Sequence, residues 1–475
     1  MKDYKSKELI FLFSIITVIV ALRLGVFLYV YSIDPSRNIT PKYGSMSYNS
    51  DAGGYQNLAV NLLRTGSFSR DGRLELMRTP GYPFFVASIY RLFGVNHFYV
   101  ILIQILISAC TIIMTYLIAR KIFGVNAALT SIFLLILDFS SLYSSQKIFT
   151  ETLFTFTLVI AVTAGLKIEW SDKKKRWAIL LGLMLAITTL IRPITYFLIF
   201  PVIIGFAIAK WSSWKWKKMV VILLLIMIPW FILIGGWKLR NYYHFGTFEF
   251  SSIMSHTMLT RRAPEVLYLR DGISRKEASL KVQSSLPNIE ELSIDERNKL
   301  SKQKAMSIIV KNPFIYLKAL THGIGRMMFV PGEAELVTYL TYKGGELEKE
   351  GPAGDLLRLS FNDYMRKWLL KSDVFLWFCC AFIYIIIFYI CFAHGYWRAV
   401  AIERNKNILH YFILGVIIYL ILTAAGSWAN SRYRVPIMPL IAIYSGKGFW
   451  AFIQCFRSGK RLRDFIFDPK SSSLP

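Results

Sequence analysis

Long apolar stretches recur along the chain and are separated by short polar and basic turns. Examples are residues 10–30, 101–118 and 220–236. Each is long enough to cross the roughly 30 Å hydrocarbon core of a bilayer as an α-helix. Because unpaired backbone groups are costly in lipid, we expect these stretches to be helical. The pattern predicts an all-α polytopic membrane protein.

Ten membrane-spanning helices are predicted. They cover residues 9–31, 98–119, 124–142, 149–168, 177–191, 193–209, 219–239, 373–394, 408–426 and 435–454. The segment 82–93 is apolar but too short to span comfortably, so we expect a juxtamembrane or re-entrant helix on the outer side. The first stretch contains Arg23 and lacks a small-residue cleavage pattern, which favours an uncleaved anchor over a signal peptide.

Composition supports this fold class. Hydrophobic residues make up 55% of the 475 residues and charged residues only 18%, whereas soluble domains carry about 25% charged residues. A net charge of +27 would be typical of nucleic-acid binding in a soluble protein. In a membrane protein, Lys and Arg accumulate in short cytoplasmic loops. We therefore expect the lipid bilayer, and no nucleic acid, as a partner.

The basic clusters predict the orientation. With the N-terminus inside, every short cluster falls on the cytoplasmic side, so we expect both termini to lie in the cytoplasm. We expect the protein itself in the inner, cytoplasmic membrane. The clusters are Arg120-Lys121, residues 173–176, Lys210 with residues 215–218, Arg398 with Arg404 and Lys406, and residues 457–463.

The predicted spans divide the chain into three parts. Residues 1–239 form a transmembrane module with a first outer loop at 32–97. Residues 240–371 form a large outer loop with interfacial helices, and residues 372–475 form C-terminal helices with a basic cytoplasmic tail.

The first outer loop holds a candidate catalytic carboxylate, Asp51, just before a short amphipathic segment with Tyr55. Two interpretations stay open. Asp51 could accept a backbone N–H as a helix N-cap, or it could act as a general base at the membrane surface. No histidine spacing indicates a zinc site.

Six motifs resemble the family 39-type GT-C glycosyltransferases, which include the dolichyl-phosphate-mannose protein mannosyltransferases and the lipid A aminoarabinose transferase. They lie in family order across most of the chain. They are Asp51 with Tyr55 and the Arg78-Thr79-Pro80-Gly81-Tyr82-Pro83 run, residues 119–124, residues 150–154, residues 190–193, Pro229-Trp230 with Trp237 and residues 240–242, and residues 431–439.

The resemblance implies a GT-C-like bundle of about ten helices and an inverting transfer of a sugar from a polyprenyl-phosphate carrier. Asp51 would deprotonate the acceptor hydroxyl, with Glu151 as a second catalytic acid that orients it. The substrate-binding candidates are Tyr55, Arg78, Arg192, Arg240, Arg432 and Arg434. Arginine suits the leaving phosphate because its charge is permanent and its donors are forked. The family allows a divalent cation without requiring one.

Each candidate also has a structural interpretation. Glu151 could simply favour a helix N-terminus, Arg240 could end a helix at the interface, and Arg432 and Arg434 could reach lipid headgroups. Arg192 could pair with a carboxylate such as Asp138.

The chain also departs from the family. Ala52 follows Asp51 where the protein mannosyltransferases carry a second acid, and the 78–83 run differs from theirs. The acceptor, which could be a glycan, a lipid or a protein, is therefore open. Two other classes compete: a transporter or lipid flippase, and an O-antigen polymerase or ligase. Scarce mid-span charges disfavour the transporter, and the Asp51 motif disfavours the polymerase or ligase.

Overall fold

The computed structural model describes residues 2–33, 51–286, 292–330, 372–402, 407–426 and 429–458. These residues are almost entirely helical, and the one sheet among them is a two-stranded antiparallel hairpin. The all-α, multi-pass class predicted from the sequence is confirmed. The division of the chain into three parts stays a prediction, and residues 331–371 and the tail 459–475 lie outside the described residues.

The first half of the chain contains most of the bundle. Its elements are α1 (Lys2–Ile33), α2 (Asp51–Thr65), β1 (Ser69–Arg70), β2 (Arg73–Leu74), α3 (Gly81–Phe93), α4 (His97–Phe123), α5 (Val125–Ile136), α6 (Phe139–Ser145), α7 (Glu151–Trp170), α8 (Lys174–Ile191), the 3-10 turn η3 (Pro193–Thr195), α9 (Ile199–Lys210) and α10 (Trp216–Phe245).

The second half adds shorter helices and then three long ones. Its elements are α11 (Ile253–Thr257), the π-helical turn η4 (Met258–Arg262), α12 (Ala263–Asp271), α13 (Arg275–Gln283), α14 (Ile294–Lys311), α15 (Pro313–Phe329), α20 (Ser372–Ile402), α21 (Asn407–Ala424), the 3-10 segment η8 (Ser431–Ile437) and α22 (Met438–Ser458).

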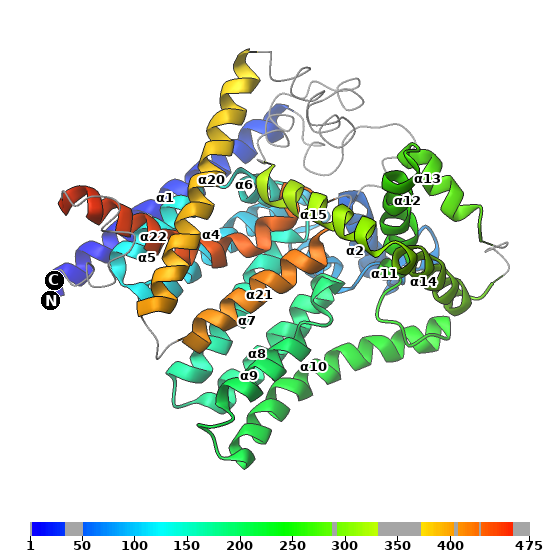
Figure 1. The fold of residues 1–475 in the computed structure, drawn as a ribbon, viewed down its shortest axis with the longest axis horizontal. Helices are drawn as coiled ribbons and strands as arrows, with labels where there is room; N and C mark the ends of the chain where they lie inside the picture. Colours follow the sequence, from blue (N-terminus) through cyan, green and yellow to red (C-terminus); the bar gives the residue numbers. More distant parts are fainter. Residues whose placement is uncertain are drawn as a thin grey trace.

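The two ends of the bundle differ in what they carry (Figure 1). The start of α1, the end of α22 and the basic turns between α4 and α5, α7 and α8, and α9 and α10 lie at one end. Helices α2, α6 and α11 to α15 lie at the other end. This arrangement agrees with the separation that the basic clusters predict. We call these the basic end and the outer end.

The predicted count of ten spans is not confirmed. Among the described residues, seven helices are long and apolar enough to cross a membrane, and an eighth if the bent pair α5 and α6 is one span. Helix α8 begins with three cationic residues, Lys174, Lys175 and Arg176, which leaves a shorter apolar part. The apolar part of α21, Ile408–Ala424, is also short.

The predicted span 124–142 is broken. Helix α5 ends at Ile136, and α6 leaves at an angle of 66°. Asp138 causes the change of direction, because its carboxylate accepts the backbone N–H of Ser141 at 3.0 Å and so begins a new helix. The segment 82–93 forms the short helix α3, which packs against α2.

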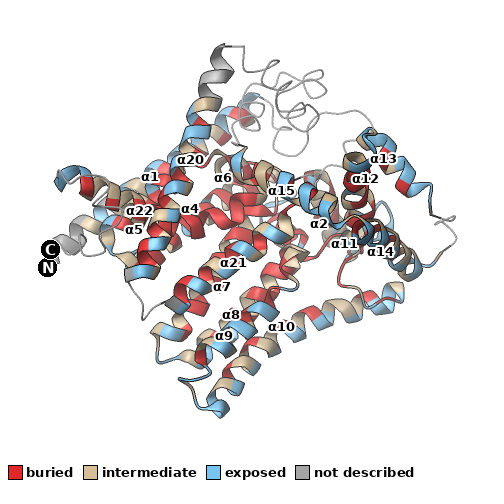
Figure 2. Cartoon of the chain, in the orientation of Figure 1, coloured by how far each residue is buried: buried red, intermediate tan, exposed pale blue. Residues whose placement is uncertain are grey.

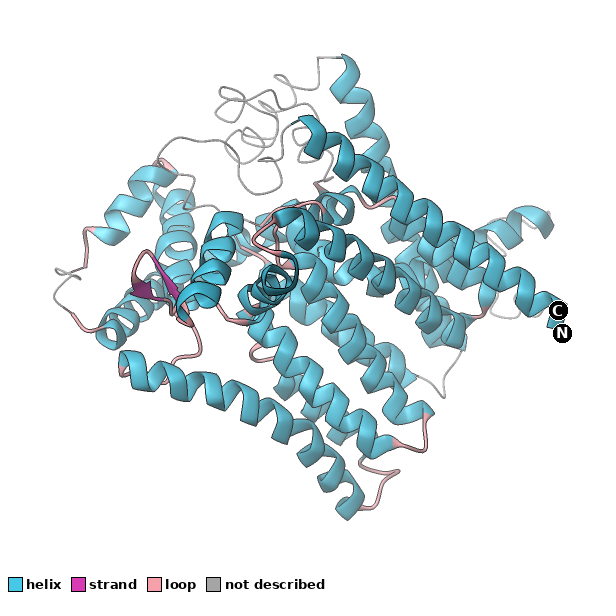
Figure 3. Ribbon diagram, turned by 180° about the vertical axis from the view of Figure 1, so that it is seen from behind, coloured by secondary structure: helices cyan, strands magenta, loops and turns pink. Residues whose placement is uncertain are grey.

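The outer end includes a small helical unit made of α11 to α14. It has its own apolar core, with Leu259, Ala263 and Val282 buried in it. The β1–β2 hairpin lies beside this unit in Figure 3. Hydrogen bonds join the unit to the chain after the hairpin: Ser252 N donates to Leu76 O at 3.3 Å, and Ser251 Oγ donates to Met77 O at 2.5 Å.

The centre of the bundle is closely packed, as the buried residues in Figure 2 show. Where α20 crosses α22, the backbones touch through glycines. A Cβ on Gly448 would lie 2.0 Å from the carbonyl oxygen of Cys391, and one on Gly395 would lie 2.0 Å from that of Tyr444. Small residues at such crossings let transmembrane helices approach closely.

We predict that Gly448→Ala destabilises the protein. The added methyl must push α20 and α22 apart, and overpacking of this kind costs about 1–3 kcal/mol. Thermal unfolding of the detergent-solubilised protein should show a Tm lower by a few degrees. The matched control is Gly415→Ala in α21, where nothing lies within 4 Å of an added Cβ. Equal Tm values for the two variants would contradict this packing.

Candidate active site

The Asp51 carboxylate lies at the outer end, where α2 begins. Asp51 is itself the first residue of α2, so its negative charge is stabilised by the helix N-terminus. Its Oδ2 accepts from Arg432 Nη1 at 3.1 Å, and its Oδ1 lies 3.8 Å from Arg78 Nη2. The Asp51 side chain is still 50% exposed. A carboxylate that two arginines hold in place is therefore open to an incoming molecule.

Glu151 lies behind Asp51 and is fully buried at the start of α7. Its Oε1 accepts from Arg192 Nη1 at 2.7 Å and from Arg432 Nε at 2.5 Å. A buried carboxylate stays ionised only when it is paired in this way. Arg432 thus bridges Asp51 and Glu151. Arg192 thus pairs with a carboxylate, but the partner is Glu151, whereas Asp138 lies near Arg434.

Local sequence explains where the arginines lie. Arg192 follows the last turn of α8 in extended conformation (φ −140°, ψ 123°), as expected for the residue before a proline. Arg432 lies in η8, which leads into α22. Aromatic rings support both guanidinium groups: Phe149 lies 3.7 Å from Arg432 Cζ, and Tyr433 lies 5.4 Å from Arg192 Cζ.

Arg78 explains why position 54, in the first turn of α2, is a glycine. A Cβ on Gly54 would lie 2.6 Å from Arg78 Cζ, so only glycine lets the guanidinium lie against the helix. Arg78 is 9% exposed, and its Nη1 has no hydrogen-bond partner among the described residues. The Oε2 atom of Glu75 lies 3.9 Å from this nitrogen. Arg78 therefore keeps one N–H donor that no hydrogen bond in the described part of the chain uses.

The 78–83 run attaches the first outer loop to the end of α8. A Cβ on Gly81 would lie 2.7 Å from the carbonyl carbon of Leu190, and Thr79 Oγ1 donates to Ile191 O at 3.2 Å. The buried Tyr82 hydroxyl donates to Gln104 Oε1 at 2.6 Å. This packing brings Arg78 and Arg192 to the same place although they are far apart in sequence.

Tyr55 lies beside the cluster. Its ring meets that of Tyr82 edge to face at 5.1 Å, and Arg78 Cζ lies 5.4 Å from its centre. Burial, followed by the charge of Asp51, raises the pKa of Tyr55 to about 12. The hydroxyl therefore stays protonated at neutral pH and can donate a hydrogen bond.

The electrostatics of Asp51 favour the ionised form. Burial alone would raise the pKa of Asp51, but the positive charges of Arg432, Arg78 and Arg192 outweigh it and hold the pKa below its ordinary value. The carboxylate is thus ready to accept a proton, although its basicity is reduced while the arginines remain on it.

Two predicted phosphate-binding arginines lie apart from this cluster. Arg240 Nη1 donates to Glu75 O and Asn241 Oδ1, both at 3.0 Å, and its guanidinium lies 4.8 Å from the Trp237 ring. Arg434 is 1% exposed. It donates to Val330 O at 2.5 Å and lies 3.7 Å from Asp138 Oδ1. Both arginines hold backbone carbonyls in the structure.

The sequence patterns assigned no role to Phe149, Tyr433 or Glu75. Phe149 stands next to the motif at residues 150–154, and Tyr433 lies inside the motif at residues 431–439. An aromatic neighbour of an arginine is a usable signal for stacking. Glu75 accepts the backbone N–H of Met77 at 2.7 Å and of Arg78 at 3.3 Å. No pattern in the hairpin sequence indicates this turn-closing role.

The residues of the cluster do not fit a divalent cation between the two carboxylates, because the guanidinium of Arg432 lies there. Within the described part of the chain, no group of three or more His, Cys, Asp and Glu side chains could hold a metal ion. Chemically, the cluster combines an accessible carboxylate with three arginines, an arrangement that can accept a proton and stabilise a phosphate in one place.

Comparisons with known proteins support the resemblance. Residues 77–235 match the family model described as dolichyl-phosphate-mannose-protein mannosyltransferase. The resemblance to this family is confirmed over that range. The range contains Arg78, Glu151 and Arg192 but not Asp51 or Arg432.

Individual relatives are distant. An uncharacterized protein of Aquifex aeolicus is 31% identical over 142 residues, which are 28% of each chain. The Archaeoglobus fulgidus oligosaccharyltransferase aligns with 92% of this chain and 51% of its own, at 14% identity and a TM-score of 0.46. ArnT from Cupriavidus metallidurans, solved with undecaprenyl phosphate, aligns over 93% of this chain and 79% of its own, at 14% identity and a TM-score of 0.40. The chain thus spans about half the length of the oligosaccharyltransferase and 28% of the curated relative.

We predict that Arg240→Ala loosens the β1–β2 hairpin, because Glu75 O and Phe68 O lose their shared donor. Trypsin should then cleave after Arg70 or Arg73 on the order of tenfold faster, since a hydrogen bond from a charged donor contributes about 1.5–3 kcal/mol. Cleavage is followed by mass spectrometry of the folded protein. Lys238→Ala, in the same helix, is the control. Unchanged hairpin cleavage in Arg240→Ala would return Arg240 to the candidates for phosphate binding.

Proposed function

We propose that this protein is an inverting glycosyltransferase that moves a sugar from a polyprenyl-phosphate carrier to an acceptor hydroxyl. The observation that carries the proposal is the half-exposed Asp51 carboxylate held among Arg78, Arg192 and Arg432 at the outer end. The family match over residues 77–235 supports the same class of reaction. We further propose that the outer end faces away from the cytoplasm, because the basic turns lie at the opposite end.

The proposed reaction is a single displacement. The acceptor oxygen attacks the anomeric carbon while its proton passes to the Asp51 carboxylate. The bond from the anomeric carbon to the phosphate oxygen breaks, and its electron pair leaves with the polyprenyl phosphate. Attack from the face opposite the phosphate inverts the configuration. The proton on Asp51 is then lost to water.

The arginines are proposed to bind the phosphate of the carrier. Arg78 Nη1 is buried without a hydrogen-bond partner among the described residues, so it has a donor to give when the phosphate displaces the groups that cover it. Arg432 donates to the buried Glu151 through Nε and to the half-exposed Asp51 through Nη1, so its guanidinium group extends from the interior to the surface. A developing charge on the leaving phosphate is stabilised best by donors that are already in position.

Binding of the donor is proposed to activate the base. An incoming phosphate competes with Asp51 for Arg432 and Arg78, and each contact that shifts to the phosphate removes a charge that lowers the Asp51 pKa. Asp51 therefore becomes more basic when the donor is bound. Glu151 stays paired with Arg192 and keeps Arg432 near the site, which makes it a positioning residue.

We predict that Asp51→Asn abolishes sugar transfer. An amide cannot accept the proton, and loss of a general base costs about 10²–10⁴-fold in rate. Membranes containing the protein are supplied with a panel of undecaprenyl-phosphate sugars labelled in the sugar, and the release of label from the lipid is measured. The matched control is Asp71→Asn, an acid at the hairpin turn whose side chain is 63% exposed.

Two outcomes would contradict the proposal. Equal transfer by folded Asp51→Asn would remove the proposed base. Movement of the intact labelled lipid across the membrane, with no release of sugar by the unaltered protein, would favour a flippase instead.

The pH dependence follows from the lowered pKa of Asp51. Because the ionised form is required, kcat/KM should stay level as pH falls from 7 and decline only below the ordinary value of 3.8. In Arg78→Gln, one of the charges that lowers this pKa is gone, so the acidic limb should move to higher pH. The measurement is a kcat/KM profile for both proteins. A limb that moves to lower pH, or does not move, would show that Arg78 does not act on the base.

A further inference from the structure

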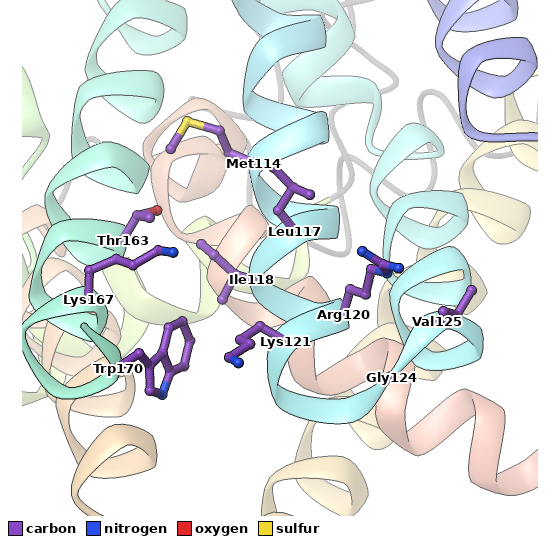
Figure 4. A pocket seen from close by; sticks show the side chains of 10 residues that line it. All are labelled: Met114, Leu117, Ile118, Arg120, Lys121, Gly124, Val125, Thr163, Lys167 and Trp170. Carbon is purple, nitrogen blue, oxygen red and sulfur yellow. The ribbon is translucent and has the colours of Figure 1, made fainter. Parts of the chain in front are cut away.

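A cavity of about 550 Å³ lies at the basic end, between the ends of α4 and α7 and the start of α5. Figure 4 shows the ten side chains that line it. Lys167 points from α7 toward Ile118 on α4, and Lys121 points from α4 toward Trp170. Gly124, with φ +87°, separates α4 from α5 and forms part of the wall.

The cavity is far from the Asp51 cluster. Glu151 begins α7, and Trp170, which lines the cavity, ends this helix of 20 residues. A helix of this length spans about 30 Å. The two sites therefore lie at opposite faces of the membrane, and the cavity takes no part in the reaction proposed above.

The side chains that line the cavity carry positive charges, and carboxylates neutralise only part of this charge. No acidic residue is among the ten that line it. Arg120 is neutralised by Glu8, with its Nε 2.7 Å from Oε1, and it points away from the other two cations. Lys121 and Lys167 form no ion pair with a carboxylate in the described part of the chain, and Lys167 lies 5.7 Å from the Trp177 ring. Two ammonium groups thus face one space without a counter-ion.

The remaining lining is apolar. Met114, Leu117 and Ile118 lie one to two turns deeper along α4 than Lys121, toward the middle of the membrane. Leu117 is 51% exposed, so this wall opens toward the surrounding lipid. A free anion would meet apolar surface over most of such a cavity. A ligand with an anionic head and a hydrocarbon chain would match both parts.

We propose that this cavity binds one anionic phospholipid, with the phosphate between Lys121 and Lys167 and an acyl chain along Met114 and Leu117. Basic pockets between transmembrane helices on the cytoplasmic side are suited to lipid head groups. Trp170 contributes an amphipathic ring at headgroup depth. The bound lipid fills the cavity between α4 and α7 and balances the two charges.

Native mass spectrometry of the full-length protein tests the proposal. Delipidated protein in detergent is titrated with phosphatidylglycerol, and separately with phosphatidylcholine of the same acyl chains. One phosphatidylglycerol should bind more tightly than phosphatidylcholine. In the double variant Lys121→Gln and Lys167→Gln, this binding should weaken on the order of tenfold, because each near-surface lysine contributes to attraction of an anionic head.

The matched control removes the same charge at the same end. Lys175 and Lys217 are exposed in the first turns of α8 and α10 and do not line the cavity. Lys175→Gln with Lys217→Gln should bind phosphatidylglycerol as the unaltered protein does. Leu117→Trp, which fills the apolar part without changing charge, should also weaken binding. Because Leu117 is exposed, the larger side chain does not overpack the core, and circular dichroism checks the fold.

Three results would overturn the proposal. The first is unchanged phosphatidylglycerol binding in the Lys121 and Lys167 double variant. The second is an equal loss in the Lys175 and Lys217 control. The third is displacement of phosphatidylglycerol by inorganic phosphate at the same concentration, which would show a site for a free anion.

Discussion

The outer end of the protein depends on the buried carboxylate of Glu151. An ionised group cannot be buried without partners, and Glu151 receives two: Arg192 from the end of α8 and Arg432 from η8. The ion pairs therefore hold together three segments that are far apart in the sequence. Because Arg432 also reaches Asp51, the same constraint sets the position of the candidate base.

The arginines near this face fall into two groups according to their partners. Arg240 and Arg434 donate hydrogen bonds mainly to backbone carbonyls. One arginine can serve several carbonyls because its guanidinium group has five N–H donors. Arg78, Arg192 and Arg432 contact carboxylates instead. A phosphate can replace a carboxylate as an acceptor but cannot replace the carbonyls of a folded turn. Only the second group is therefore suited to exchange partners when a ligand binds.

The two faces of the bundle concentrate charge in different ways. At the outer end, carboxylates and arginines neutralise one another within a compact cluster. At the basic end, Lys121 and Lys167 face an apolar cavity without acidic neighbours in its lining. The first arrangement is stable by itself and suits chemistry in which partners change. The second leaves positive charge for the lipid bilayer to balance.

The sequence by itself determined the helical, multi-pass class, because apolar length is a local property. It also predicted that the basic turns lie together at one end of the bundle, because charge placement is local as well. It also indicated Asp51, Glu151, Arg78, Arg192 and Arg432 through motifs. It could not show that Asp138 breaks the span 124–142, or that Arg192 pairs with Glu151. Those outcomes, and the separation of Arg240 and Arg434 from the cluster, were decided by tertiary structure, since only packing between distant segments selects which opposite charges meet.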